Sequence, residues 1–219
     1  GLDGSGKSTQ LNLLRAYLEK RSVPYRYLHF PRLEVGVYGN LIARFLRGEM
    51  GSIGEVDPYL VALLFAGDRA DAAGQIRDWM DQGILVIADR YVYSNIAFQC
   101  AKLSSKEDAD RLRDWILDFE YRYQELPRPD INLFLNVPFT FTRKQLENQR
   151  EGDDRAYLRG QRDIHEGDLQ FQERVRKIYL SLAGFVDDLE IIECMDEKGW
   201  MLSPEAISEK VVEQISDAR

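Results

Sequence analysis

The first eight residues, Gly-Leu-Asp-Gly-Ser-Gly-Lys-Ser, constrain the fold more than any other part of the sequence. They match the pattern G-x-x-x-x-G-K-[ST] in full, and a helical pattern of apolar residues begins directly after them. The glycines let successive backbone N–H groups turn inward around phosphate oxygens, and the following helix points its positive end at the same place. A glycine-rich turn before an unrelated helix is the alternative, but the flanking periodicity favours a nucleoside triphosphate site.

Particular side chains of this loop have expected roles. Lys7 would reach the β- and γ-phosphates, and the Ser8 hydroxyl would be a ligand of Mg²⁺. Because such a loop follows a buried strand, we expect about six to ten apolar residues upstream of Gly1 in the natural protein. The residues expected to contact ATP are Gly1, Gly4, Ser5, Gly6, Lys7, Ser8 and Thr9.

The rest of the chain alternates helical patterns with short apolar strands. The strand at 84–88 is apolar throughout, as is typical of a strand buried on both faces of a parallel sheet. This alternation predicts an α/β fold, a doubly wound parallel sheet flanked by helices, in one domain over 1–219. The expected helices lie at 9–21, 37–46, 58–82, 109–124, from Pro138 onward, 171–186 and 204–215, and the expected strands at 25–30, 84–88, 132–137 and 190–193.

The composition excludes several classes of function. Charged side chains sum to 29 − 37 = −8, which argues against a broad surface for nucleic acid or anionic membranes. No apolar run approaches the roughly 20 residues of a membrane span, and we find no secretory signal. The two cysteines form no metal-binding or disulfide pattern, so we expect reduced thiols and a cytoplasmic location.

An aspartate and an arginine directly follow the apolar run at 84–88. A carboxylate at the carboxyl end of a parallel strand lies where ligands bind, so Asp89 is a candidate Mg²⁺ ligand, directly or through water. Arg90 would point into the same crevice and bridge phosphates. A strand that ends in a carboxylate is common, and the functional interpretation therefore depends on the phosphate loop.

Two pairs of residues indicate a second substrate. Phe30 and Arg32 follow another predicted strand, where an acceptor phosphate would arrive. Phe65 and Arg69 are four residues apart and share one helix face, so an aromatic ring could stack on a base while the guanidinium bonds its edge. Core packing of Phe65 and a solvated Arg32 are the alternatives.

The segment 151–167 is polar and carries both charges, including Arg155, with Arg150 just before it. Runs of mixed charge are usually solvated surfaces. The functional alternative is a lid that closes, excludes water and brings arginines to the transferred phosphoryl group.

Nearly the whole chain resembles the thymidylate kinase family. A phosphate loop alone is shared by many kinases, whereas the segment at 89–99 is much more specific. The segments that carry the resemblance are GLDGSGKST at 1–9, FPR at 30–32, LLFAGDR at 63–69, DRYVYSNIAFQ at 89–99, PDINLFL at 129–135 and FQERV at 171–175.

The resemblance implies roles for the matching residues. Asp3 would bond the deoxyribose 3′-hydroxyl, and Arg32 and Arg90 would hold the monophosphate of dTMP. Phe65 would stack on thymine, and Arg69 would bond its edge. Further residues of the same acceptor pocket are Phe30, Ser94 and Gln99.

In this family the catalytic arginine lies in the phosphate loop or in the lid. Here Gly4 follows Asp3, so the loop offers no further basic side chain, and the lid must supply the arginine. Arg155 is the first candidate and Arg150 the second. The lid departs from the family in detail, since it is long and His165 precedes Glu166 where a tyrosine is often found.

The resemblance implies Mg²⁺-dependent transfer of the γ-phosphoryl group of ATP to dTMP for dTTP synthesis, by a cytoplasmic homodimer. Lys7 and Arg90 would act beside the lid arginine. The first alternative is a kinase of another nucleoside monophosphate or of a deoxynucleoside. A P-loop switch is less favoured because the guanine motif Asn-Lys-x-Asp is missing, and a catalytically inactive nucleotide binder is a further alternative.

Overall fold

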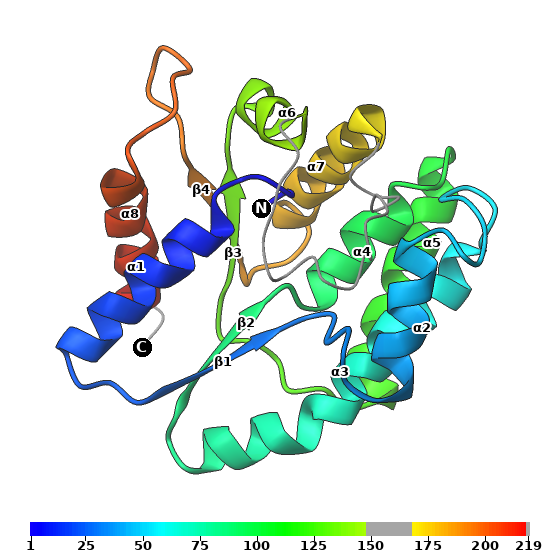
Figure 1. The fold of residues 1–219 in the computed structure, drawn as a ribbon, viewed down its shortest axis with the longest axis horizontal. Helices are drawn as coiled ribbons and strands as arrows, with labels where there is room; N and C mark the ends of the chain where they lie inside the picture. Colours follow the sequence, from blue (N-terminus) through cyan, green and yellow to red (C-terminus); the bar gives the residue numbers. More distant parts are fainter. Residues whose placement is uncertain (148–167, 218–219) are drawn as a thin grey trace. The chain divides into compact units, whose positions relative to one another are not determined.

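A computed structural model describes residues 1–147 and 168–217 of the protein (Figure 1). The predicted lid at 151–167, with Arg155, and Arg150 before it lie outside the described residues. Contacts divide the chain into two compact units. Unit 1 comprises Gly1–Pro24, Pro129–Arg150 and Tyr179–Arg219, and unit 2 comprises Tyr25–Arg128 and Glu151–Ile178.

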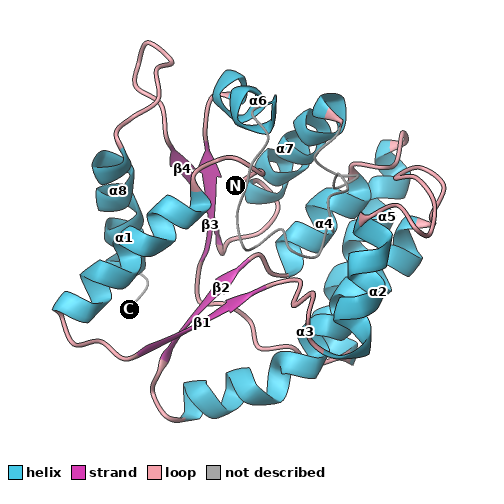
Figure 2. Cartoon of the chain, viewed as in Figure 1, coloured by secondary structure: helices cyan, strands magenta, loops and turns pink. Residues whose placement is uncertain are grey.

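Unit 1 is built on a parallel strand pair with helices beside it (Figure 2). β3 and β4 pair with Asn132 opposite Leu189 and Asn136 opposite Glu193. Helix α8 contacts both β4 and α1, and apolar side chains from β3, β4 and α8 form one core cluster. Its elements are α1 (Lys7–Lys20), β3 (Asn132–Asn136), α6 (Phe139–Glu147), the end of α7 (Leu169–Ala183), β4 (Leu189–Glu193) and α8 (Pro204–Asp217).

Unit 2 contains a second parallel pair and a group of packed helices. β1 and β2 pair with Tyr25 opposite Leu85 and His29 opposite Asp89. Helix α3 contacts α2, α4 and β2, and α4 also contacts α5. Its elements are β1 (Tyr25–His29), α2 (Gly36–Leu46), α3 (Pro58–Asp81), β2 (Leu85–Asp89), α4 (Val92–Cys100), α5 (Lys106–Leu117), the π-helical turn η1 (Asp118–Tyr123) and the start of α7.

Local sequence signals explain where the helices of unit 2 begin. Asp57 accepts a hydrogen bond from the backbone N–H of Tyr59 at 2.8 Å, and proline occupies the first turn of α3. Ser105 caps α5 in the same way through the N–H of Asp108 at 3.2 Å. Each cap satisfies a backbone donor that has no partner within its own helix.

The observed elements agree with most of the predicted ones within a few residues. Helix α4 was not among the predictions, and the helix predicted over 109–124 is α5 followed by the wider turn η1. The described strands pair in parallel, as predicted. The expected burial of both faces of β2 is wrong: Ala88 is exposed and its neighbours are half-buried. Among the described residues β2 pairs with β1 alone.

Both cysteines are buried and carry free thiols. Burial raises the pKa of the Cys100 thiol in α4 to about 12 and that of the Cys194 thiol after β4 to about 11. Within residues 1–147 and 168–217, the helices are too short or too polar to cross a membrane.

The close approach of Gly39 to the loop after β1 gives a stability test. A Cβ atom on Gly39 in α2 would lie 2.1 Å from the carbonyl oxygen of Arg32, which is backbone and cannot swing away. We expect Gly39→Ala to lower the free energy of unfolding by about 1–3 kcal/mol. Urea denaturation followed by circular dichroism measures the change.

Gly74 in α3 is the matched control. It is also a helical glycine, but a Cβ there meets no atom within 4 Å. Gly74→Ala should raise the free energy of unfolding by roughly 0.5–1 kcal/mol, because alanine loses less backbone entropy in a helix. Equal effects of the two substitutions would show that the contact with Arg32 does not limit the packing of α2.

Candidate functional site

The phosphate loop of unit 1 turns tightly and leads directly into α1. Gly4 and Gly6 have φ angles of 75° and 84°, in the left-handed region that favours glycine. A Cβ on Gly4 would also lie 2.9 Å from the Cβ of Gln145 in α6. Gly6 is the residue that caps α1, so the loop ends where the positive end of the helix begins.

The side chain of Lys7 folds back over this loop. Its Nζ donates to the carbonyl oxygen of Leu2 at 2.8 Å and to that of Gly1 at 3.4 Å, and it lies 3.9 Å from an Asp3 carboxylate oxygen. The Oγ of Ser5 is buried and has no hydrogen-bond partner among the described residues. The loop thus holds an ammonium group and an unsatisfied hydroxyl, as expected of a phosphate cradle.

Ser8 and Thr9, by contrast, are exposed in the first turn of α1. The hydroxyl of Ser8 is therefore accessible, and a hydroxyl oxygen suits Mg²⁺, which prefers oxygen ligands. Asp89 in unit 2 offers a carboxylate of the same kind, although its Oδ2 lies 3.1 Å from the Nδ1 of His29 across the β1–β2 pair. The described residues contain no cluster of three or more His, Cys, Asp or Glu that could hold a metal by itself.

Arg90 follows β2 with an unusual backbone. Its φ angle is 65°, which costs energy in a residue with a side chain. Its guanidinium lies 5.0 Å from the ring centre of Phe98 in α4. Strained residues of this kind persist where the surrounding structure holds them, and they concentrate at functional sites.

The loop after β1 holds Arg32 in a fixed orientation. The peptide bond between Phe30 and Pro31 is cis, and the Phe30 ring is buried with its centre 5.9 Å from that of Tyr91. The Arg32 side chain is only 12% exposed, so the alternative of a solvated loop arginine is wrong. Its ion-pair partners come from α3, which makes this loop part of the packed unit.

Two aspartates of α3 bind three of the donors of Arg32. The Nε–H donates to an Asp68 carboxylate oxygen at 2.9 Å, and Nη2 donates to the Asp68 carbonyl at 2.8 Å and to Asp71 at 2.7 Å. The backbone N–H of Arg32 also donates to Asp68, at 2.8 Å. The Nη1 group makes no hydrogen bond to the described residues, so two N–H donors are left for a ligand.

The second predicted pair, Phe65 and Arg69, lies on the same helix but in different surroundings. Phe65 is half-buried and packs against an apolar cluster of α2 and α3. Arg69 is 2% exposed, and its Nε and Nη2 donate to the carboxylate of Glu120 at 2.5 and 2.7 Å. The guanidinium predicted to meet a base edge is thus one half of a buried ion pair.

A polar residue of α4 binds the same Glu120 carboxylate as Arg69. Asn95 is buried, and its Nδ2 donates to the Glu120 carboxylate at 2.9 Å and to the Ala62 carbonyl at 3.0 Å. Gln99 is also buried, and its Oε1 has no partner in the described chain. Ser94 is half-buried on the same helix.

Sequence reasoning missed Asp68, Asn95 and Glu120. The first two stand inside the segments LLFAGDR and DRYVYSNIAFQ that carry the family resemblance, and that position was the available signal. Glu120 is one of many acids between residues 106 and 125, and nothing in the local sequence distinguishes it.

Two further groups of unit 2 have shifted pKa values because they are buried. Burial raises the pKa of Tyr91, whose hydroxyl donates to the Pro127 carbonyl at 3.1 Å, to about 12. Burial lowers the pKa of Lys102, which follows α4, to about 7. The Nζ of Lys102 lies 4.7 Å from the ring centre of Phe45 and has no hydrogen-bond partner among the described residues.

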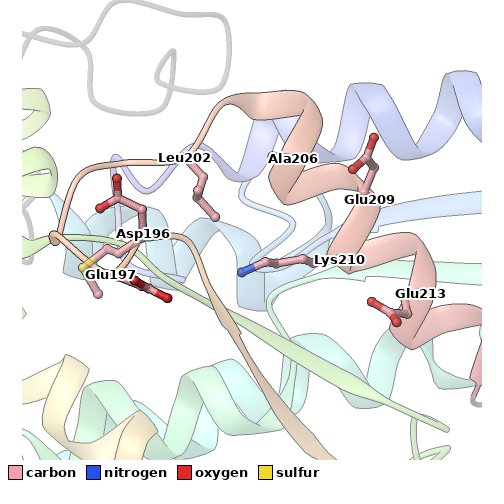
Figure 3. Close-up of a pocket in the computed structure, with 8 residues that line it drawn as sticks. Asp196, Glu197, Leu202, Ala206, Glu209, Lys210 and Glu213 are labelled. Carbon is pink, nitrogen blue, oxygen red and sulfur yellow. The ribbon is translucent and has the colours of Figure 1, made fainter.

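A groove in unit 1 lies beside α8, and none of the predicted site residues is among the residues that line it (Figure 3). Its only cation, Lys210, donates to the backbone carbonyl of Glu193 at 2.8 Å. With four carboxylates against one ammonium group, the groove disfavours an anionic triphosphate. Its lining residues are Met195, Asp196, Glu197, Leu202, Ala206, Glu209, Lys210 and Glu213.

Comparisons with known proteins point to one family. The family model described as Thymidylate kinase matches residues 1–198. Thymidylate kinase from Mycobacterium tuberculosis is 32% identical over 184 residues, which are 84% of this chain and 83% of that protein. Thymidylate kinase from Plasmodium falciparum is 32% identical over 151 residues, 69% of this chain and 65% of that protein.

A solved structure shows the same likeness in three dimensions. The structure of thymidylate kinase from Candida albicans matches with a TM-score of 0.71 at 24% sequence identity, covering 99% of this chain and 88% of that one. The predicted α/β fold class is thereby confirmed.

The buried Lys102 gives a test of stability against pH. Its pKa is about 7 in the folded chain against an ordinary 10.5, so between these values the unfolded chain binds the extra proton. The contribution of Lys102 to stability therefore falls as pH drops from 10.5 to 7. We expect the stability gained by Lys102→Met to be larger at pH 7 than at pH 10.5, by about 1–3 kcal/mol.

Chemical denaturation of both proteins across this pH range measures the difference. The control is Lys106→Met, because Lys106 begins α5 only four residues away and its side chain is 82% exposed. That variant should follow the wild type at every pH. A pH-independent difference for Lys102→Met would contradict the burial of its ammonium group.

Proposed function

The chain belongs to the thymidylate kinase family, and from this premise we propose that it transfers the γ-phosphoryl group of ATP to dTMP, giving dTDP and ADP. The observation that carries the proposal is Arg32, a nearly buried guanidinium with its Nε and Nη2 bound by Asp68 and Asp71 and its Nη1 left without a partner among the described residues. An arginine held in this way fits the monophosphate of an acceptor nucleotide.

The donor nucleotide is assigned to unit 1. The left-handed backbone of Gly4 and Gly6 and the start of α1 supply N–H groups and a positive helix end for the triphosphate. Lys7, which donates to loop carbonyls in this structure, would exchange them for phosphate oxygens. The remaining ATP contacts stay predictions, and they involve Gly1, Ser5, Ser8 and Thr9.

The acceptor nucleotide is assigned to unit 2. Arg90 would share the monophosphate with Arg32, and its strained backbone supports a functional position. Phe65 would stack on the base while Arg69 bonds the base edge. Further contacts proposed for the acceptor are those of Phe30, Ser94 and Gln99 in unit 2 and that of Asp3 in unit 1 with the 3′-hydroxyl.

Phosphoryl transfer of this kind needs positioning and charge neutralisation more than a strong base. Mg²⁺, held by Ser8 and Asp89 in this proposal, would neutralise charge on the phosphates. The guanidiniums of Arg32 and Arg90 would hold the acceptor phosphate in place. The ammonium of Lys7 would offset the negative charge that develops on the leaving ADP. Arg155 and Arg150 remain the proposed catalytic arginines of a lid.

Assembly as a homodimer and location in the cytoplasm are also proposals, and they follow from the family alone. Sedimentation equilibrium of the purified protein decides the first of them.

Replacing the loop lysine tests the donor site. We expect Lys7→Ala to lower kcat for dTMP phosphorylation by roughly 100-fold or more, because it removes a charge that stabilises the transition state. A coupled assay of ADP formation with the full-length protein measures the rate.

The control is Lys20→Ala at the other end of α1, where the side chain is exposed. It should keep the wild-type rate. Lack of dTMP turnover by the wild type would refute the enzyme activity itself, and full activity of Lys7→Ala would refute the role of the loop.

Comparing acceptors tests the phosphate site. Thymidine lacks the phosphate that Arg32 and Arg90 are proposed to bind, so its kcat/KM should fall below that of dTMP by roughly 100-fold or more. The same assay without acceptor measures background ATP hydrolysis. Equal use of thymidine and dTMP would identify a deoxynucleoside kinase instead.

A further inference from the structure

Glu120 lies outside every segment that carries the family resemblance, yet its side chain is completely buried. It stands in η1, where the backbone widens: the N–H of Gln124 donates to the carbonyl of Phe119 at 2.9 Å, five residues back. Wide turns of this type are rare and often mark functional sites. This one turns a carboxylate into the interior of unit 2, between α3 and α4.

The Glu120 carboxylate accepts three hydrogen bonds from two side chains. Two come from the Nε and Nη2 of Arg69, at 2.5 and 2.7 Å, and one from the Nδ2 of Asn95, at 2.9 Å. The fork of Arg69 against a carboxylate is the strong bidentate arrangement. Both partners are buried almost completely, so their orientations are fixed relative to each other.

These contacts determine which way the Asn95 amide faces. Its Nδ2 lies beside two acceptors, the Glu120 carboxylate and the Ala62 carbonyl at 3.0 Å. The amide oxygen must therefore point the other way, because turning the amide over would place oxygen against oxygen. That Oδ1 atom is buried and has no partner among the described residues.

The result is one unused donor and one unused acceptor held by the same carboxylate. The donor is the Nη1 group of Arg69, which makes no hydrogen bond to the described residues, and the acceptor is the Oδ1 atom of Asn95. A ligand edge with a carbonyl oxygen next to a ring N–H complements them. A 4-keto pyrimidine has that edge, whereas a 4-amino pyrimidine presents the opposite polarity.

We propose that Glu120 is a positioning residue that fixes this donor and acceptor polarity and so selects 4-keto over 4-amino pyrimidine nucleotides. The inference rests on the proposed function, because it assumes that the acceptor base meets Arg69. Glu120 also neutralises Arg69, so the buried guanidinium needs no anionic ligand there and tolerates an uncharged base.

The first test uses the wild-type protein with dTMP, dCMP and N3-methyl-dTMP. The methylated nucleotide keeps the phosphate but lacks the ring N–H that Asn95 would accept. We expect dTMP to protect against thermal unfolding, with dCMP and N3-methyl-dTMP binding at least about tenfold more weakly. Equal binding of dTMP and either analogue would overturn the proposal.

The second test replaces the carboxylate. Glu120→Gln puts an amide against three N–H donors of two side chains, so either the Asn95 amide turns over or Arg69 moves away. We expect the KM for dTMP to rise at least about tenfold and the kcat/KM preference for dTMP over dCMP to fall by a similar factor. The KM for ATP should stay as in the wild type, and kcat should change less than the KM for dTMP.

Two further variants separate positioning from a structural role. Glu120→Asp keeps the charge and should restore part of the preference, and it carries the test if Glu120→Gln fails to fold. Asp118→Asn makes the same charge change on an exposed residue of η1, so its preference should equal that of the wild type. A folded Glu120 variant with the wild-type preference and KM for dTMP would overturn the proposal.

The two proposals fail in different ways. A wild-type protein that does not phosphorylate dTMP would refute the kinase assignment. If the wild type phosphorylates dTMP and the Glu120 variants keep its preference for dTMP over dCMP, only the role of Glu120 is refuted.

Discussion

The ion pair of Arg69 with Glu120 is the interaction on which the rest of unit 2 depends. It joins α3 to η1, and the hydrogen bond from Asn95 adds α4 to the same carboxylate. Removing two charges from water is costly, and a single one left buried is costlier still. Helices α3 and α4 and the turn η1 therefore have one arrangement in which the buried charges are balanced. This arrangement also positions the residues of α3 and α4 that are proposed to bind the acceptor nucleotide.

A second ion pair connects α3 to the loop after β1, and in this pair the helix supplies the acid instead of the base. Asp68 and Arg69 are neighbours on α3, yet the first binds Arg32 in the loop after β1 and the second binds the glutamate of η1. One helix thus carries an acid toward Arg32 and a base toward Glu120. The proposed contacts to the phosphate and to the base are consequently spaced by a single helix, which suits a nucleotide whose sugar limits the distance between its phosphate and its base.

The sequence was sufficient for features that depend on local pattern. The phosphate loop, most of the helices and the parallel strands could be predicted because glycine spacing, helical periodicity and apolar runs act over a few residues. Helix α4 could not, because its buried residues include Asn95 and Gln99 and leave no amphipathic stripe. The partial burial of β2 depends on which strands pair with it, which is a long-range property.

The candidate site divides in the same way. Arg32 and Arg69 could be proposed from their positions after a strand and on a helix face, but their acidic partners could not be identified. Asp68 lies 36 residues from Arg32, and Glu120 lies 51 residues from Arg69. Pairing over such separations is decided by the fold. A local sequence pattern therefore predicts the arginine but does not identify the acid that pairs with it.

The two buried thiols have a practical consequence for studying this chain in solution. Reagents such as maleimides react with thiolates, and burial keeps the pKa of Cys100 and Cys194 far above neutral pH. A cysteine introduced at an exposed position such as Lys20 would then be labelled ahead of both native ones. Fluorescent or spin probes can therefore be attached at a chosen surface position without first replacing native cysteines.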